Sequence, residues 1–311
     1  MSDHQRDKSP GVSILILAII PRHRKRGRAR IPMACYLSYP TIWEVSDDLW
    51  EIIKILLDEY DPPASTGRPR DDRRPILNAI IHRFRSGCQW NHLPMEFGDD
   101  SKIHRVFQHW VKLGIFEKIW AELLTECDEL EQVQWDWQAA DGWLGKARMG
   151  GDKIGPNPTD RAKNGTKKSL LTDGVGGPLS IVIAPANVND HKLLEETLNS
   201  IVVERPKTTR AKTQHLCLDK GYDNEASREV VKEHQYKGHI RRIGEEKLDQ
   251  QGEKKHPARR YVVERTLAWL SKCRGLLIRY EKKSANYLAQ LQFACALLWY
   301  RRLLRAESTI P

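Results

Sequence analysis

The stretch that most constrains the fold of this chain runs from Gln214 to Asp223 and reads QHLCLDKGYD. Mostly apolar residues precede Asp219, and Gly221 follows it by two positions. This pattern predicts a buried strand whose last residue emerges at a sheet edge, followed by a sharp turn. A carboxylate placed there has a rigid backbone beneath it and open space in front, which suits a metal ligand. A cap for the next helix is the alternative interpretation of Asp219.

Two further acids stand at comparable places. Asp141 ends a predicted strand, Val133–Asp141, and precedes Gly142. Glu264 lies in a predicted helix over residues 258–272. Three carboxylates on three elements suit a two-metal phosphoryl-transfer site, because carboxylate oxygens are hard ligands for Mg²⁺. Two such ions, roughly 3.5–4 Å apart, stabilise both the attacking and the leaving oxygen.

Four short segments, in this order, resemble a known family. They are Asp141-Gly142, Gly155–Arg161, Leu218–Tyr222, and Arg260 with Val263–Thr266. Over residues 44–305 the chain is similar to the DDE transposases of bacterial insertion sequences, the IS-five-like group of the IS-four superfamily. The resemblance implies an enzyme that cleaves insertion-sequence ends and transfers them into target DNA. It also implies a catalytic, metal-binding triad of Asp141, Asp219 and Glu264, with two Mg²⁺ (or Mn²⁺) ions as cofactors.

The chain departs from the family pattern on the helix that contains Glu264. Arg260 lies four residues earlier and shares its helix face. In the family this Arg lies near the scissile DNA, although a surface ion pair explains the same spacing. The family also has a Tyr three before the Arg and a Lys seven after the Glu, where this chain has Pro257 and Ser271. Lys272 stands one position further along, so the DNA contact of this helix is less well supported than the triad.

Other aspartates compete with the triad. Asp136 is the rival of Asp141 as first ligand. Five positions apart on one strand, the two side chains point to opposite faces, so only one of them joins the site. We take Asp141, which matches the family motif. Asp173, Asp190 and Asp223 are interpreted as turn or cap residues, since Asp-Gly at position 173 is itself a turn signature.

The order of predicted elements indicates two folded parts. Residues 44–130 are typical of short helices joined by tight turns, which predicts a helix-turn-helix-like DNA-binding domain, with a plain helical bundle as the alternative. Residues 131–305 are predicted in the order βββαβαβ followed by a helix, which is the order of an RNase-H-like catalytic domain. The expected fold class is therefore α+β or α/β, with a mixed sheet flanked by helices. A final apolar helix, residues 287–304, should pack on the sheet.

The basic charge is unevenly distributed. Residues 1–40 contain eight Lys/Arg and two Asp, which is +6 of the formal net charge of +10. The remainder is modestly basic, which weakly favours a nucleic-acid partner. The apolar run Val12–Ile20 is too short to span a bilayer. A basic stretch follows it instead of a small-residue cleavage site, so we expect a disordered basic leader, with Met33 as a possible natural start.

The cysteines and the apolar segments bear on location. Six cysteines stand at no metal-ligand spacing, and several lie in apolar runs. This predicts reduced, buried thiols in a cytosolic protein. With no membrane span expected, we place the protein in the bacterial cytoplasm, associated with the nucleoid.

Two basic segments are the predicted DNA contacts. Residues 146–168 contain seven Lys/Arg against two Asp and lie beside Asp141, and a loop of this length is usually functional or disordered. Thr66–Arg70 suits either minor-groove insertion or a solvated turn. The predicted contact residues, with the helix arginine, are Arg68, Arg70, Lys146, Arg148, Arg161, Lys163, Lys167, Lys168 and Arg260. The expected partner is double-stranded DNA, both transposon ends and target, bound by a homodimer.

Two other functions remain open at this point. One is a catalytically inactive DNA-binding protein derived from a transposase, which would not need three spaced carboxylates. The other is an RNase-H-like nuclease, which would cleave DNA without strand transfer. A strand-transfer assay separates all three.

Overall fold

The computed structural model describes residues 42–63, 66, 72–240 and 261–309. The predicted leader, together with Arg68, Arg70, Pro257 and Arg260, lies outside the described residues.

The N-terminal part is helical, as predicted. Its elements are α2 (Asp47–Tyr60), α3 (Arg73–Ser86), η1 (Trp90–His92), η2 (Met95–Phe97), α4 (Asp100–Lys112) and α5 (Ile115–Glu129). Side chains at the helix starts satisfy backbone N–H groups that have no partner within the helix. Ser46 accepts from Leu49 N, and Asp99 accepts from Lys102 N. Gly87 ends α3 in the left-handed region at φ 71°, where glycine is favoured.

The C-terminal part contains a mixed sheet. Its strands are β1 (Trp137–Ala147), β2 (Gly155–Pro156), β3 (Asn164–Thr172), β4 (Pro178–Pro185), β5 (His215–Leu218), β6 (Lys237–Ile240) and β7 (Ile278–Arg279). The long strands lie in the order β4-β3-β1-β5-β6, in which β1, β3 and β4 are antiparallel and β1, β5 and β6 are parallel. Apart from the two-residue strands, this is the arrangement of an RNase-H-like domain, so the predicted fold class is confirmed.

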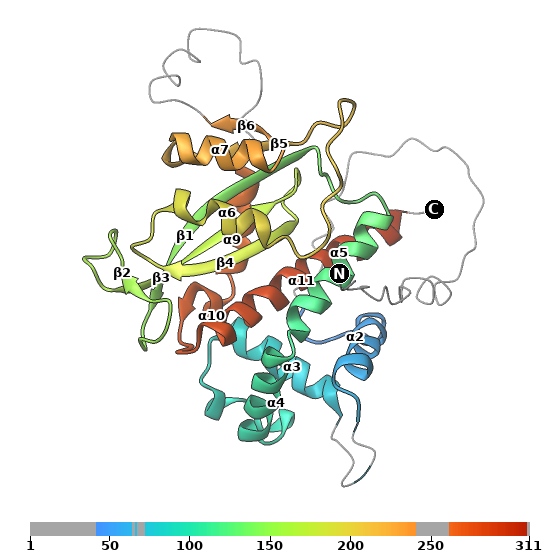
Figure 1. The fold of residues 1–311 in the computed structure, drawn as a ribbon. Coiled ribbons are helices and arrows are strands. Elements are labelled where there is room, and N and C mark those ends of the chain that lie inside the picture. Colours follow the sequence, from blue (N-terminus) through green and yellow to red (C-terminus); the bar gives the residue numbers. More distant parts are fainter. Residues whose placement is uncertain (1–41, 64–65, 67–71, 241–260, 310–311) are drawn as a thin grey trace, which may run out of the picture.

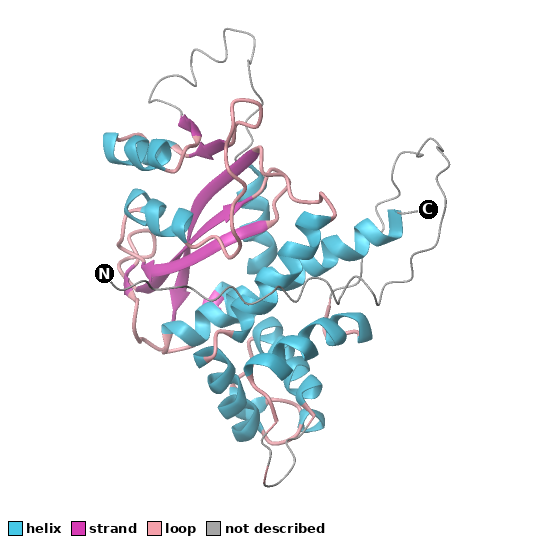
Figure 2. Ribbon diagram, turned by 45° about the vertical axis from the view of Figure 1, so that its right-hand side comes forward, coloured by secondary structure: helices cyan, strands magenta, loops and turns pink. Residues whose placement is uncertain are grey.

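Helices cover both faces of the sheet (Figures 1 and 2). They are α6 (Leu194–Asn199), α7 (Glu225–Glu233), α9 (Tyr261–Ser271), α10 (Arg274–Leu277) and α11 (Ser284–Thr309), with the short turns η3 (Asp190–Leu193) and η4 (Lys220–Tyr222). Neighbouring residues of β3 show which helices share a face. Ser169 accepts a hydrogen bond from Thr197 of α6, whereas Lys168 donates to Leu276 of α10. Because successive side chains alternate across a strand, α6 covers one face and α9 and α10 the other.

Two expectations about β1 are wrong. The strand does not end at Asp141 but continues to Ala147, because β3 pairs with it along this whole length. The segment 146–168 is therefore not a long loop. Its two ends belong to β1 and β3, and Asn157 N donates to Lys163 O within the turn between them. Asp136, in turn, precedes β1 and is exposed, so it does not share a strand with Asp141.

The two parts share one hydrophobic core. The apolar helix α11 packs against both α5 and β4, as predicted, and in Figure 1 it passes between the N-terminal helices and the sheet. Buried side chains on both sides of residue 130 form a continuous cluster. The domain boundary at that position stays a prediction. Of the cysteines described, Cys127, Cys217, Cys273 and Cys295 are buried, and Cys88 is half-buried. No helix within the described ranges is long and apolar enough to cross a membrane.

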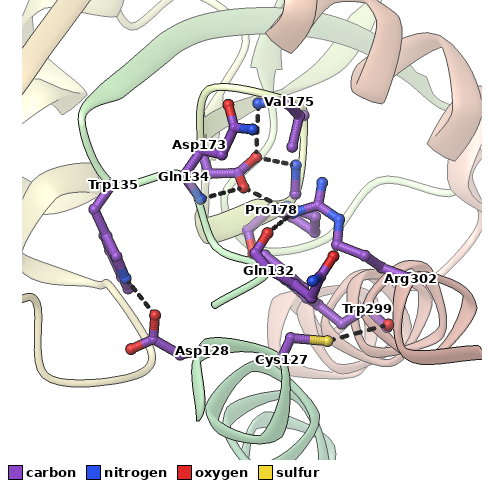
Figure 3. Close-up of polar contacts among 12 residues, drawn as sticks. Cys127, Asp128, Gln132, Gln134, Trp135, Asp173, Val175, Pro178, Trp299 and Arg302 are labelled. Carbon is purple, nitrogen blue, oxygen red and sulfur yellow. Dashed lines mark hydrogen bonds and ion pairs between the residues drawn. The ribbon is translucent and has the colours of Figure 1, made fainter. Parts of the chain in front are cut away.

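Asp173 joins the β3–β4 turn to α11 (Figure 3). Its carboxylate is fully buried. One oxygen accepts from the backbone N–H groups of Val175 and Gly177 at 3.1 and 2.5 Å. The other accepts from Gln134 N at 3.1 Å and from the Arg302 guanidinium at 2.7 Å. Asp173 is thus a turn residue, as predicted, and it also forms an ion pair across the core.

We expect Asp173→Asn to lower the free energy of unfolding by about 3–5 kcal/mol, the cost of breaking a buried ion pair. Both carboxylate oxygens of Asp173 accept hydrogen bonds, so the NH₂ group of the new side chain would face a hydrogen-bond donor in either of its orientations. Urea denaturation measures the loss. The control is Asp58→Asn, which removes an exposed partner of Arg73 and should cost at most about 1 kcal/mol. Equal losses in the two variants would contradict this role of Asp173.

Candidate active site

The pairing of β1 with β5 places two acids side by side. These strands are parallel, with Ala139 opposite Cys217. Asp141 and Asp219 each stand two residues beyond this last printed pair, so the parallel register brings both to the same end of the two strands. β5 ends at Leu218, and Asp219 begins the turn η4, where its side chain accepts from Lys220 N at 2.6 Å. The predicted strand and turn around Asp219 are confirmed.

Glu264 comes from the helix on the same face as Asp141. Residues directly opposite in an antiparallel pair share a face, so Asp141 lies on the α9–α10 side with Lys168. α9 packs on β1 and β3 through buried residues such as Val263 and Leu267. Glu264 stands in the first turn of this helix and is exposed.

The donor set suits a hard divalent cation, because it offers carboxylate oxygens on rigid elements. Asp141 and Asp219 are held on adjacent strands, and Oδ1 of Asp141 accepts from Gly142 N at 2.8 Å. Within the described residues, no three acidic, His or Cys side chains are already gathered as a metal-binding group. The roles of Asp141, Asp219 and Glu264 as metal ligands therefore stay predictions.

Asp190 lies directly behind this site, where the sequence interpretation placed only a turn or cap residue. It is the first residue of η3, and the N-cap position of this turn is Asn189. A Cβ atom built on Gly142 would stand 1.8 Å from Asp190 Oδ1. The other oxygen, Oδ2, accepts from Lys167 Nζ at 2.9 Å. Gly142 therefore leaves room for the carboxylate of Asp190. The glycine at this position was the sequence signal that another side chain packs closely there.

Tyr222 lies among these carboxylates. Its side chain is 1% exposed, and its hydroxyl lies beside Ser169 without a hydrogen bond of ordinary geometry. Burial raises the pKa of Tyr222, and the nearby charges of Asp190, Asp141 and Asp219 raise it further. The hydroxyl is therefore a protonated donor at neutral pH.

The predicted basic contacts separate into two groups. Lys146, Arg148, Arg161 and Lys163 are exposed on the β1–β3 hairpin. Lys167 and Lys168 are buried, because one pairs with Asp190 and the other donates to Leu276 O. Both were predicted to contact DNA, and burial of their ammonium groups removes them from the DNA-facing surface.

The hairpin is anchored to the start of the last helix. Arg279 is buried, and its guanidinium donates to the carbonyl oxygens of Asp152 at 2.7 Å and Lys282 at 3.0 Å. The Asp152 carboxylate accepts from Ser284 N at 2.9 Å, and hydrogen bonding to Ser284 lowers the pKa of Asp152. The exposed basic residues therefore project from a fixed support.

An RNase-H-like sheet with acids at the β1–β5 junction is the framework of a metal-dependent phosphoryl-transfer enzyme. The family described as "Transposase DDE domain" matches residues 141–299, and "Putative transposase of IS4/5 family (DUF4096)" matches residues 45–120. The chain belongs to the DDE transposases of insertion sequences. It is thus a DNA-cutting and DNA-joining enzyme of transposition, and the DDE domain implies DNA binding and a divalent metal.

The chain is also similar to individual proteins. The "Putative transposase for insertion sequence element IS402" of Burkholderia cepacia is 34% identical over 172 residues, which cover 52% of this chain and 76% of that protein. "Uncharacterized protein y4sN" of Sinorhizobium fredii is 32% identical over 84 residues, 26% of this chain and 64% of that protein. The crystal structure of the Mos1 mariner paired end complex with Mn matches at TM-score 0.25 and 8% identity, over 83% of this chain and 86% of that chain.

We expect Gly142→Ala to lower the free energy of unfolding by about 1–3 kcal/mol, the cost of overpacking, because the new methyl group would overlap Asp190. Gly145→Ala on the same strand is the matched control, since its Cβ would meet nothing closer than 3.4 Å. Urea denaturation of both variants compares them directly. A smaller loss at position 142 than at 145 would contradict the close approach of Asp190.

We expect Lys168→Met to stabilise the protein most at neutral pH. Burial lowers the pKa of Lys168 from its ordinary value of 10.5 to about 8. Below pH 8 the ammonium is charged in both states and burial has its full cost, on the order of 3 kcal/mol before the lost hydrogen bond to Leu276 is subtracted. Above pH 8 the folded chain releases this proton before the unfolded chain does, so wild-type stability rises towards pH 10.5.

The gain of Lys168→Met over wild type should therefore shrink between pH 8 and 10, as measured by urea denaturation at several pH values. Lys232→Met, at an exposed site on α7, is the control and should show a constant difference. Parallel curves for wild type and Lys168→Met would contradict the burial of a charged Lys168.

Proposed function

We propose that Asp141, Asp219 and Glu264 form the metal-binding triad of this transposase and that they hold two Mg²⁺ or Mn²⁺ ions. Ions held by these three carboxylates would supply charge stabilisation for the attacking oxygen, of water and later of the freed DNA 3′-hydroxyl, and for the leaving oxygen in an in-line displacement. The observation that supports the proposal most directly is the β1–β5 register, which brings Asp141 beside Asp219.

Each acid has a distinct structural support. Asp141 lies within a strand that is paired on both sides, so its backbone is held firmly. Asp219 stands where β5 gives way to a turn, which leaves its carboxylate next to the last paired residues. Glu264 is at the N-terminal end of α9, from which it can approach the face that Asp141 occupies. We assign no Ser or Tyr nucleophile, because the displacement needs no covalent protein–DNA intermediate.

We further propose that the exposed basic residues of the β1–β3 hairpin bind the transposon end. Lys146, Arg148, Arg161 and Lys163 would contact phosphates, which position the DNA without reading its sequence. Arg68, Arg70 and Arg260 lie outside the described residues and stay predicted contacts. The partner would be double-stranded DNA, transposon end and target, bound by a homodimer in the bacterial cytoplasm at the nucleoid.

The triad is tested by Asp141→Asn, Asp219→Asn and Glu264→Gln, which keep the side-chain shape and remove one charged ligand each. Each change should lower end cleavage by at least about three orders of magnitude, the scale of roughly 4 kcal/mol of transition-state stabilisation. Binding of end DNA in a mobility-shift assay should persist, because phosphate contacts come from Lys and Arg. Cleavage and strand transfer are measured on a labelled transposon end.

Asp136→Asn is the matched control. Asp136 is exposed and precedes β1, so this change should leave cleavage nearly unaffected. Loss of cleavage in Asp136→Asn but not in Asp141→Asn would make our choice of first ligand wrong. Full cleavage in all of the variants would rule out the triad.

A further inference from the structure

Two buried polar atoms near the proposed triad have no hydrogen-bond partner. One is the hydroxyl oxygen of Tyr222 and the other is Oδ1 of Asp190. The first is a donor and the second an acceptor. Burying either without a partner is unfavourable, because it loses its bonds to water and gains none in return. Among the neighbouring charges that act on Tyr222, that of Asp190 is the strongest.

Both residues belong to short turns that pack together. Tyr222 ends η4, the turn that begins just after Asp219, and Asp190 begins η3. The two turns are in contact. Because Tyr222 follows Asp219 by three residues in the same turn, a displacement of Asp219 also displaces Tyr222.

Asp190 is in turn fixed against the strand that contains Asp141. Its Oδ1 lies where a Cβ of Gly142 would be, and its Oδ2 is held by Lys167 at 2.9 Å. Lys167 is itself buried on β3, next to β1 in the sheet. Asp190 is thus held to the β1–β3 pair through Oδ2, and its Oδ1 is the oxygen that could accept a hydrogen bond from η4.

We propose that Tyr222 and Asp190 are a positioning pair for the proposed metal ligands: when Asp141 and Asp219 hold metal, the Tyr222 hydroxyl donates to Asp190 Oδ1. Neither residue touches DNA or the metal in this role. In this proposal, a shift of η4 relative to η3 when Asp219 holds metal would bring the Tyr222 hydroxyl and Asp190 Oδ1 within hydrogen-bond distance. Formation of the new bond then adds to metal affinity. The inference rests on the proposed triad.

The test measures Mn²⁺ affinity of the full chain, without DNA, by isothermal titration calorimetry, together with thermal unfolding of the metal-free protein. Tyr222→Phe removes only the hydroxyl. It should weaken Mn²⁺ binding by about tenfold, the scale of one hydrogen bond to a charged group. It should leave the unfolding temperature of the metal-free protein unchanged or slightly higher, since a buried hydroxyl without a hydrogen-bond partner is removed.

Tyr236→Phe is the matched control. Tyr236 is also buried, but its hydroxyl already donates to Gln138 Oε1 at 2.6 Å. This change should therefore lower the unfolding temperature and leave Mn²⁺ affinity as in wild type. The two Tyr→Phe variants should thus show opposite patterns, which a general structural role for buried tyrosines does not produce.

Asp190→Asn tests the acceptor. Its single oxygen should stay with the Lys167 ammonium, so that an amide N–H faces the Tyr222 hydroxyl and the bond from that hydroxyl to a charged oxygen is lost. Asp190→Asn should weaken Mn²⁺ binding at least as much as Tyr222→Phe does. The double variant should bind Mn²⁺ no more weakly than Asp190→Asn alone, because each change breaks the same bond.

Wild-type Mn²⁺ affinity in Tyr222→Phe, or additive losses in the double variant, would overturn the positioning pair. The proposed triad would still hold after that result if Asp141→Asn abolishes Mn²⁺ binding and cleavage. Absence of Mn²⁺ binding and cleavage in the wild-type protein would overturn the triad and the pair together.

Discussion

The parallel pairing of β1 with β5 is the contact on which the rest of the site depends. These strands come from segments about 75 residues apart in the chain, and hydrogen bonds alone do not select their register. Both faces of these strands are buried: Ala139 and Ala140 of β1 and Leu216 and Leu218 of β5 all lie in the core. Sliding one strand by a residue would reverse the faces of its side chains. The same register that buries these residues also sets Asp141 beside Asp219.

Alternation along β3 explains why two adjacent lysines have different roles. Lys167 points to the side of α6, where Asp190 neutralises it, and Lys168 points to the side of α10, where it meets only a carbonyl and the Trp143 ring. A buried lysine therefore lies on each face of the β1–β3 pair, one with a carboxylate partner and one without.

The N-terminal helices and the sheet do not have separate hydrophobic cores. Trp120 of α5 and Trp299 of α11 both donate to the carbonyl oxygen of Pro178, at the start of β4. Asp173 and Arg302 add an ion pair at the same junction. DNA bound by the helices would therefore be held at a defined position relative to the hairpin that Arg279 anchors. This coupling matters for an enzyme that must align a DNA end with its metal site.

The sequence by itself determined the order of the elements, the RNase-H-like class, the strand and turn at Asp219, and the candidate triad, since each rests on local periodicity or on a short motif. Tertiary structure decided what local patterns do not contain. It extended β1 past Asp141, because pairing with β3 outweighs the local turn signal of Gly142. It buried Lys167 and Lys168, which composition alone groups with the exposed basic residues. It also placed Asp190 against Gly142, a contact between residues far apart in the chain. Burial and contact depend on which surfaces the whole chain brings together, and no short stretch of sequence specifies that.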